Sequence, residues 1–149
     1  MFNAIKNENA VSGPWKTLVL GNDDTPASVK LPVGPVLVPL QVWKARRAEL
    51  IHREYEHGWP LGIWLSAEES AAEIADDIDD FTVVAVRFDR FSDGSSYATA
   101  RALRELYGYT GELRAIGDVP KERPVYHHQA GFNTGAVRIS QPKANLAIA

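Results

Sequence analysis

The stretch TVVAVRFDRFSDGSSYATARALRELYGYTGELRAI, residues 82–116, decides the fold class of this chain. It begins with Thr82–Phe88, a β-branched and mostly apolar run that is typical of a central strand buried on both faces. Helix-forming residues follow over 95–107, begun by a serine and ended by Gly108. Residues 112–116 then return to a strand pattern. A strand, a helix and a strand in this order predict a parallel βαβ unit.

Two further strand–helix pairs precede this stretch. Residues 61–65 form a short apolar run that we interpret as a buried strand. The next four residues, 66–69, match a capping box, in which the Ser66 hydroxyl accepts from the Glu69 amide and the Glu69 carboxylate accepts from the Ser66 amide. Residues 41–57 contain no glycine or proline and predict a longer helix that ends at Gly58.

Each predicted helix has an apolar side that we expect to face the core, because residues three and four apart share one helix face. In chain order the expected inward residues are Trp43, Leu50, Ile51 and Tyr55, then Ala71, Ile74, Ala75 and Ile78, then Thr99, Leu103 and Leu106.

The two ends of the chain are less regular. Strand patterns at 16–20, 29–31 and 36–38 are interrupted by a turn at residues 21–24 and by prolines, so we expect edge or irregular strands there. Near the other end, the pattern predicts a short helix at 124–130 and a last strand at 136–139. We expect three segments: a flexible arm over 1–15, a single α/β domain over 16–139 and a tail over 140–149.

The predicted fold class is therefore α/β, with a mostly parallel sheet built from βα units and a short irregular β region at the N-terminus. Its crossovers should be right-handed. Two arrangements stay open: an open three-layer sheet with helices on both faces, or a sheet that curls as a partial barrel. Strand order is not written in the spacing of the elements, so the sequence does not choose between them.

Composition excludes several classes of function. The 149 residues carry a formal net charge of −3 and no basic stripe, so no nucleic-acid partner is expected. The chain has no cysteine, which excludes disulfides, iron–sulfur clusters and thiolate catalysis. No secretory signal and no apolar run of about 20 residues is visible, so we expect a cytoplasmic protein that makes no membrane contact. No dinucleotide or P-loop fingerprint is present, and no cofactor is evident.

Ligands of parallel α/β sheets bind beyond the carboxyl ends of the strands, which directs attention to the loops after 82–88 and 112–116. Gly94 permits a close backbone approach, and the helix start that follows favours an anion. Ordinary turn and cap chemistry explains the same residues equally well. The candidate ligand-binding residues are Asp93, Gly94, Ser95, Ser96, Tyr97, Arg101, Gly117 and Asp118.

Asp93 and Asp118 are the candidate catalytic residues, since they follow strands that are neighbours in the sequence. If these strands are adjacent in the sheet, the two carboxylates can act as an acid–base pair or hold a divalent cation. The alternative is that each carboxylate accepts hydrogen bonds from its own loop. No metal site is predicted elsewhere, because the adjacent His127 and His128 point about 100° apart on a helix. Whether the protein is an enzyme stays open.

Acidic residues are concentrated between residues 66 and 80. This segment holds seven of the nineteen acids and no lysine or arginine. Such asymmetry can steer the docking of a basic partner, although a solvated helix face has the same composition.

The central part of the chain resembles a bacterial family catalogued as domain of unknown function nine-three-four. The resemblance covers residues 33–139, and its matching pieces are Phe88, Phe91, Asp93-Gly94, Tyr97, Ala100-Arg101, Leu103-Arg104, Gly108-Tyr109, Gly111-Glu112-Leu113-Arg114-Ala115, Gly117-Asp118-Val119 and Gly131-Phe132. The chain departs from the family pattern at Ser95, where an arginine is usual, and at Glu122-Arg123, where an Asp-Gln pair is frequent. If that arginine contacts an anionic ligand in the family, this chain lacks a bidentate donor at Ser95.

The resemblance implies a link to sulfite reduction and sulfur assimilation, and some family members carry an oxidoreductase label. Two hypotheses follow from it. In the first, the protein is a non-catalytic accessory protein that binds sulfite reductase or another sulfur-assimilation enzyme. In the second, it is a small enzyme or an anion- or nucleotide-binding protein that uses the loops after the 82–88 and 112–116 strands, with a small anionic ligand.

Overall fold

The computed structural model describes residues 15–89, 93–119 and 129–133. The elements in chain order are β1 (Lys16–Thr17), β2 (Val36–Pro39), α1 (Leu40–His57), β3 (Leu61–Leu65), the 3₁₀ helix η1 (Ala71–Asp80), β4 (Val83–Phe88), α2 (Asp93–Glu105) and β5 (Glu112–Gly117).

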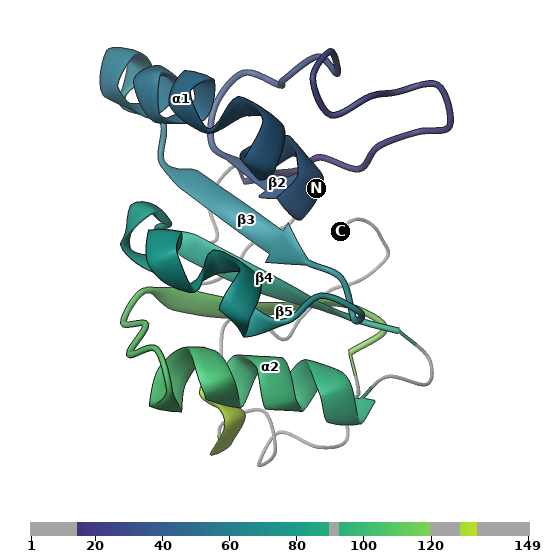
Figure 1. Cartoon of the computed structure of the whole chain (residues 1–149), viewed down its shortest axis with the longest axis vertical. Coiled ribbons are helices and arrows are strands. Elements are labelled where there is room, and N and C mark those ends of the chain that lie inside the picture. Colours follow the sequence, from purple (N-terminus) through teal and green to yellow (C-terminus); the bar gives the residue numbers. More distant parts are fainter. Residues whose placement is uncertain (1–14, 90–92, 120–128, 134–149) are drawn as a thin grey trace.

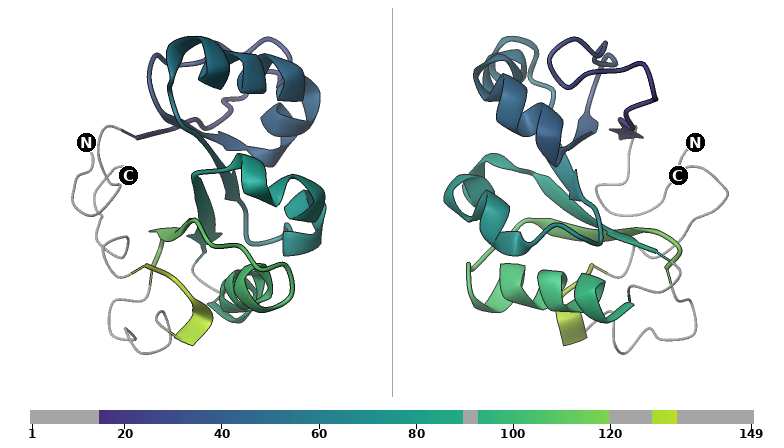
Figure 2. Two further views of the ribbon diagram at one scale, coloured as in Figure 1. Left: turned by 90° about the vertical axis from the view of Figure 1, so that its left-hand side faces the viewer. Right: turned by 45° about the vertical axis from the view of Figure 1, so that its right-hand side comes forward.

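All five strands form one parallel sheet in the order β1-β2-β3-β4-β5, so the predicted α/β class is confirmed. When successive parallel strands are neighbours and every crossover is right-handed, all crossover helices lie on the same side of the sheet. Figure 1 and Figure 2 show α1, η1 and α2 side by side on one face of a curled sheet. For the described residues, this is the partial-barrel arrangement and not the three-layer one.

The main core lies between the sheet and these helices. Alternate strand residues point into it, as the two-residue repeat of a strand requires. The bulkiest fully buried side chains there include Trp43 from α1, Ile74 from η1 and Leu103 from α2. The strand residues that join them are Val36, Val38, Leu61, Ile63, Leu65, Val84, Val86, Phe88, Leu113 and Ala115.

A second, smaller apolar cluster lies on the other face of the sheet. It consists of Leu37, Trp64, Val83 and Ala85, with Trp15 and Ile116 packed against it. Gly62 faces the same cluster, and a Cβ atom there would lie 2.6 Å from Leu37 Cδ2 and 3.0 Å from the Val83 carbonyl oxygen. The glycine therefore allows close packing on the face that carries none of the described helices.

Of the three strands predicted near the N-terminus, only the one at 36–38 is present in full, as β2. The expected 16–20 strand covers only Lys16–Thr17, and 29–31 forms no strand. The Leu18 amide still donates to Leu37 (2.9 Å), but the Leu18 carbonyl accepts from the Trp64 indole N–H (2.8 Å). The next ladder bond to the Leu18 carbonyl would come from residue 39, but Pro39 has no N–H, so the Trp64 indole supplies the donor and the pairing of β1 ends there.

The predicted inward face of α1 is partly wrong. Trp43 and Leu50 are buried, but Ile51 is 41% exposed and Tyr55 is 88% exposed. The helix is kinked at Arg46, whose backbone has φ −133° and ψ 31°. The inward stripe runs through Leu40, Trp43 and Leu50, which leaves Ile51 and Tyr55 turned to solvent.

Two other helix predictions need correction. Half of the capping box forms, with the Ser66 amide donating to Glu69 Oε1 (2.8 Å), but the Glu69 amide bonds the Ser66 carbonyl (3.1 Å) instead of its hydroxyl. The box therefore closes a turn, and η1 begins only at Ala71. Leu106 is 74% exposed because α2 ends at Glu105, one residue before it. The predicted 136–139 strand and most of the 124–130 helix lie outside the described residues.

Candidate functional site

The loops after β3, β4 and β5 meet at the carboxyl edge of the sheet, as the sequence predicts. Ser95 Oγ, at the start of α2, donates to the Ala67 carbonyl after β3 (3.3 Å). The Asp118 amide after β5 donates to the Phe88 carbonyl at the end of β4 (2.9 Å). The structure thus brings three of the predicted segments together at one edge.

Three of the candidate ligand-binding residues, Ser95 among them, make contacts within the fold. Ser96 is fully buried, and its hydroxyl donates to the Arg87 carbonyl (2.9 Å), which ties the first turn of α2 to β4. Tyr97 is half-buried, and its ring lies edge-on to Phe88 (5.1 Å) and close to Phe132 (6.4 Å). The Ser96 hydroxyl is therefore engaged by the fold at the place where an anion would need a donor.

The remaining candidates lie at the surface. Gly94, Arg101 and Asp118 are exposed, and a Cβ atom on Gly94 would meet no other atom. Gly117 has φ +82°, and a Cβ atom there would lie 2.5 Å from the Phe88 carbonyl oxygen, so the turn requires glycine. The Asp93 side chain lies outside the described part, and the proposed Asp93–Asp118 pair stays a prediction. The described residues contain no group of three or more acidic or histidine side chains that could hold a metal.

Several residues after β4 that carry the family resemblance lie around one arginine, Arg104. Arg104 on α2 donates to the carbonyls of Tyr109 (2.8 Å), Gly111 (2.8 Å) and Gly131 (2.9 Å), and to Asn133 Oδ1 (3.1 Å). Burial lowers the pKa of the Arg104 guanidinium, which nevertheless stays charged at neutral pH. Arg104 therefore holds the 129–133 segment against α2 and β5.

Tyr109 lies beneath this arginine, with the guanidinium 5.6 Å from its ring centre. Its buried hydroxyl donates to the Phe81 carbonyl (3.0 Å) and lies 3.3 Å from the Glu112 carbonyl. Burial raises the pKa of Tyr109 far above its ordinary value, so the phenol stays neutral. Packing around Arg104 and Tyr109 thus accounts for several of the positions that carry the family resemblance.

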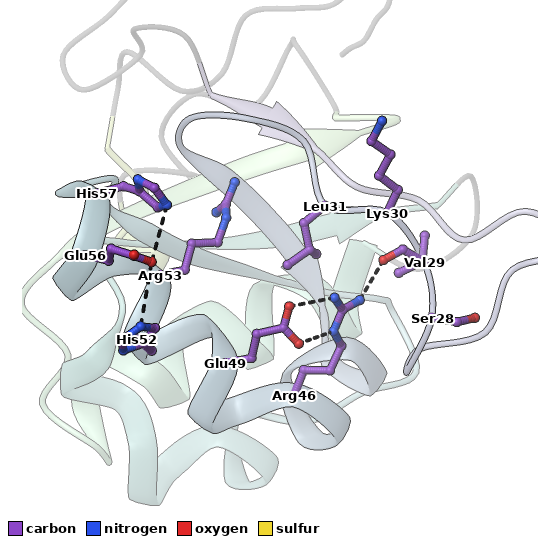
Figure 3. Close-up of a pocket in the computed structure, with 10 residues that line it drawn as sticks. All are labelled: Ser28, Val29, Lys30, Leu31, Arg46, Glu49, His52, Arg53, Glu56 and His57. Atoms are coloured by element: carbon purple, nitrogen blue, oxygen red, sulfur yellow. Dashed lines mark hydrogen bonds and ion pairs between the residues drawn. The ribbon is translucent and has the colours of Figure 1, made fainter.

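A groove that sequence reasoning missed lies between the 28–31 loop and α1 (Figure 3). It has a volume of about 540 Å³ and is lined by Ser28, Val29, Lys30, Leu31, Arg46, Glu49, His52, Arg53, Glu56 and His57. Three lysine or arginine side chains and two carboxylates line it, which leaves an excess of one positive charge with the histidines neutral. The sequence signal was present in the spacing of Arg46, Glu49, Arg53 and Glu56 along α1, but the loop opposite could not be placed.

Arg46 and Arg53 hold the loop to the helix at this groove. Arg46 forms a two-pronged ion pair with Glu49 (both 2.8 Å) and donates to the Val29 carbonyl (2.6 Å). The hydrogen bond with Glu49 raises the pKa of Arg46 and lowers that of Glu49. Arg53 instead donates to the carbonyls of Pro32 and Gly34 and lies 4.7 Å from the centre of the Trp59 ring system.

The outer end of the groove carries Glu56 between two histidines (Figure 3). Glu56 Oε1 lies 3.6 Å from His52 Nε2 and 3.5 Å from His57 Nε2. All three side chains are substantially exposed, so these contacts contribute little to stability. His52 and Glu56 are four residues apart on α1, a spacing that is typical of an exposed helix pair.

The acidic segment lies on the opposite side of α1, where η1 packs against it. Glu73 pairs with Lys44 (2.9 Å), and Asp77 pairs with Arg47 (2.6 Å) and accepts from the Trp43 indole (3.1 Å). These two carboxylates bind η1 to α1. In the part of the chain that the structure describes, no ion pair involves the exposed Asp76, Asp79 or Asp80.

Two carboxylates, Glu54 on α1 and Asp80 on η1, lie near each other at the end of this segment. Desolvation raises the pKa of Glu54 on α1, and the nearby charge of Asp80 raises it further.

A second, shallow groove of about 230 Å³ runs between η1 and α2, lined mostly by alanines together with Ser70, Thr99 and Tyr107. The exposed Leu106 and Tyr107 follow α2 directly. Exposed acidic side chains on η1 and exposed apolar side chains after α2 therefore belong to two helices that pack against each other.

Among the described helices, none has the length and apolar character that a bilayer crossing requires. No curated protein and no solved structure matches the chain. A family model described as "Bacterial protein of unknown function (DUF934)" matches residues 62–148, which is more than half of the chain. This span includes β4, α2, β5 and the residues around Arg104, in agreement with the resemblance noted in the sequence. The chain belongs to this family of bacterial proteins.

Proposed function

We propose that this protein is a non-catalytic accessory protein that docks a basic surface of a partner protein, and that the partner is sulfite reductase or another enzyme of sulfur assimilation. The observation that supports it is the helical surface formed by η1 and the end of α2. There, two helices pack against each other: η1 carries exposed carboxylates without ion pairs in the described residues, and exposed apolar side chains follow the end of α2. We call this the η1–α2 surface; it comprises Asp76, Asp79, Asp80, Leu106 and Tyr107.

The charge on this surface is available to a partner. The carboxylates that hold η1 to α1, Glu73 and Asp77, are already paired. Asp76, Asp79 and Asp80 are exposed, and the repulsion between Asp80 and Glu54 favours any neighbour that brings positive charge. Complementary charge of this kind accelerates association and selects partners more than it raises affinity.

The apolar part of the surface supplies binding affinity, which complementary charge raises only a little. Leu106 is 74% exposed and Tyr107 is 37% exposed, and Tyr107 lines the shallow alanine-lined groove. Interfaces combine an apolar centre with a polar rim, and tyrosine is enriched among the residues that dominate binding energy. A partner that presents lysine or arginine around an apolar side chain fits this arrangement.

The link to sulfur metabolism rests on the family resemblance, which connects family members to sulfite reduction. Binding of the full-length protein to purified sulfite reductase, followed by biolayer interferometry at low and moderate salt, tests it directly. We expect binding that weakens as salt rises, because exposed charges are screened. Asp76→Lys should weaken binding by about tenfold, and Leu106→Ser should raise the dissociation rate.

The matched control is Asp23→Lys, which makes the same change of charge at an exposed position in the 21–24 turn. It should leave the affinity nearly unchanged. If both lysine variants weaken binding equally, net charge and not the η1–α2 surface is responsible. If the wild-type protein does not bind the reductase at all, the proposed partner is wrong.

A further inference from the structure

We infer that the groove between the 28–31 loop and α1 is a binding site for a phosphate- or sulfate-class oxyanion, either free or carried on a larger molecule. This groove is on the other side of α1 from η1 and is independent of the proposed partner surface. Its volume of about 540 Å³ is within the range of small-molecule sites.

The first support is the state of Arg53. Its Nη2 donates to the Pro32 and Gly34 carbonyls, and its guanidinium lies against Trp59, so the group is held in one orientation. Its Nε and Nη1 donors have no hydrogen-bond partner among the described residues. No carboxylate is hydrogen-bonded to it in the described residues: Glu49 bonds Arg46 and acts on Arg53 only as a nearby charge. A fixed, half-buried arginine with unused donors is suited to an oxyanion.

The second support is the set of side chains around it. Lys30 lines the groove from the loop, and it makes no ion pair within the described ranges. His52 lines it from α1, and a neutral imidazole also carries one N–H donor. Glu49 and Glu56 bring negative charge, but Glu49 is bonded to Arg46 and Glu56 lies between His52 and His57. The cations still exceed the carboxylates by one.

The third support is the backbone on the groove wall. Arg46 has a non-helical conformation in the middle of α1, and its side chain reaches the Val29 carbonyl from there. Kinks of this kind have a local cause. The kink and the two arginine contacts fix the loop against α1 and so define the shape of the groove.

An NMR titration of the isotope-labelled full-length protein with inorganic phosphate, and separately with sulfate, tests the site. We expect saturable shifts confined to the amides of residues 28–31 and 46–57 and to the His52 ring. Arg53→Gln, which keeps an amide donor for the loop carbonyls, should weaken binding about tenfold. Lys30→Gln has no described bond to lose, and it should weaken binding about threefold.

The control is Lys44→Gln, which removes an exposed cation on the η1 side of α1 and should leave the titration unchanged. Adenosine monophosphate distinguishes the two sources of the oxyanion. Binding tighter than that of phosphate indicates a carried group, whereas equal binding indicates the free ion. The inference is wrong if wild-type shifts do not saturate at millimolar phosphate, or if they spread equally to the surroundings of Lys44 and Arg101.

Discussion

The two sides of α1 use basic side chains in different ways: one side pairs them with carboxylates, and on the other side Arg53 donates to backbone carbonyls. Towards η1, Lys44 and Arg47 meet the carboxylates of Glu73 and Asp77, and charge is neutralised pair by pair. Towards the loop before β2, Arg53 meets backbone carbonyls, which accept its hydrogen bonds but do not cancel its charge. Both arrangements fix a neighbouring segment to the helix.

The difference shows where charge is left for a ligand. On the η1 side, both cations are in ion pairs. The unpaired charge in the described residues is negative and lies at Asp76, Asp79 and Asp80. On the loop side the surplus is positive, at Arg53 and Lys30. A single helix thus separates a surface suited to a basic protein from a groove suited to an anion, and the same residue types have different consequences because their partners differ.

Removal of Arg53 should have the largest effect on stability. Arg53→Ala leaves the Pro32 and Gly34 carbonyls without their donor and removes the contact with Trp59, so we expect a loss of about 2 kcal/mol in the free energy of unfolding. Urea unfolding followed by tryptophan fluorescence measures it. Arg101→Ala, at an exposed position, is the control and should change the value by less than about 0.5 kcal/mol. Equal losses would show that carbonyl contacts do not hold the loop.

The η1 side should respond less strongly, and its response should separate hydrogen bonding from charge. Asp77→Ala removes the acceptor of the buried Trp43 indole as well as the partner of Arg47, which we expect to cost about 1.5 kcal/mol. Asp77→Asn keeps an acceptor for the indole and loses only the ion pair, at about 0.5 kcal/mol. The same urea experiment compares them. If Asp77→Asn lowers the free energy of unfolding as much as Asp77→Ala does, the ion pair with Arg47 and not the hydrogen bond from Trp43 accounts for the loss.

The smallest expected effect is a gain. The pKa of Glu54 is raised in the folded protein by desolvation and by Asp80, so its ionised form is disfavoured there and stability is lost as pH rises through that pKa. Glu54→Gln should therefore stabilise the protein at pH 7 by about 0.3 kcal/mol, since the site is partly solvated. The gain should vanish below about pH 4, where the wild-type carboxyl is protonated in both states. A gain that is the same at every pH would contradict this electrostatic origin.

Sequence patterns predicted the regular part of the fold well because that part depends on local periodicity. The strands at 61–65, 82–88 and 112–116 are present within one or two residues. The prediction failed where single residues interrupt the regular backbone. The β1 ladder stops because Pro39 has no N–H for the Leu18 carbonyl, and the Arg46 kink interrupts the regular helical path of α1, on which Ile51 and Tyr55 were expected to face the core.

The candidate site was predicted in part. The sequence identified the loops after β4 and β5, and the structure brings them together through Asp118 and Phe88. It could not show that the Ser96 hydroxyl is used by the Arg87 carbonyl, since that bond joins the helix to a strand nine residues earlier. The groove beside Arg53 was not predicted, because its two walls are joined only by tertiary contacts.

The sequence by itself determined the α/β class, the alternation of strands and helices, and the family to which the chain belongs. These follow from apolar periodicity and from short local motifs, which involve only residues close together in the chain. Only the tertiary structure decided that the described helices share one face of the sheet, and which charges are neutralised and which remain. Strand order and ion pairing depend on contacts between residues far apart in the chain, and no local pattern encodes such contacts.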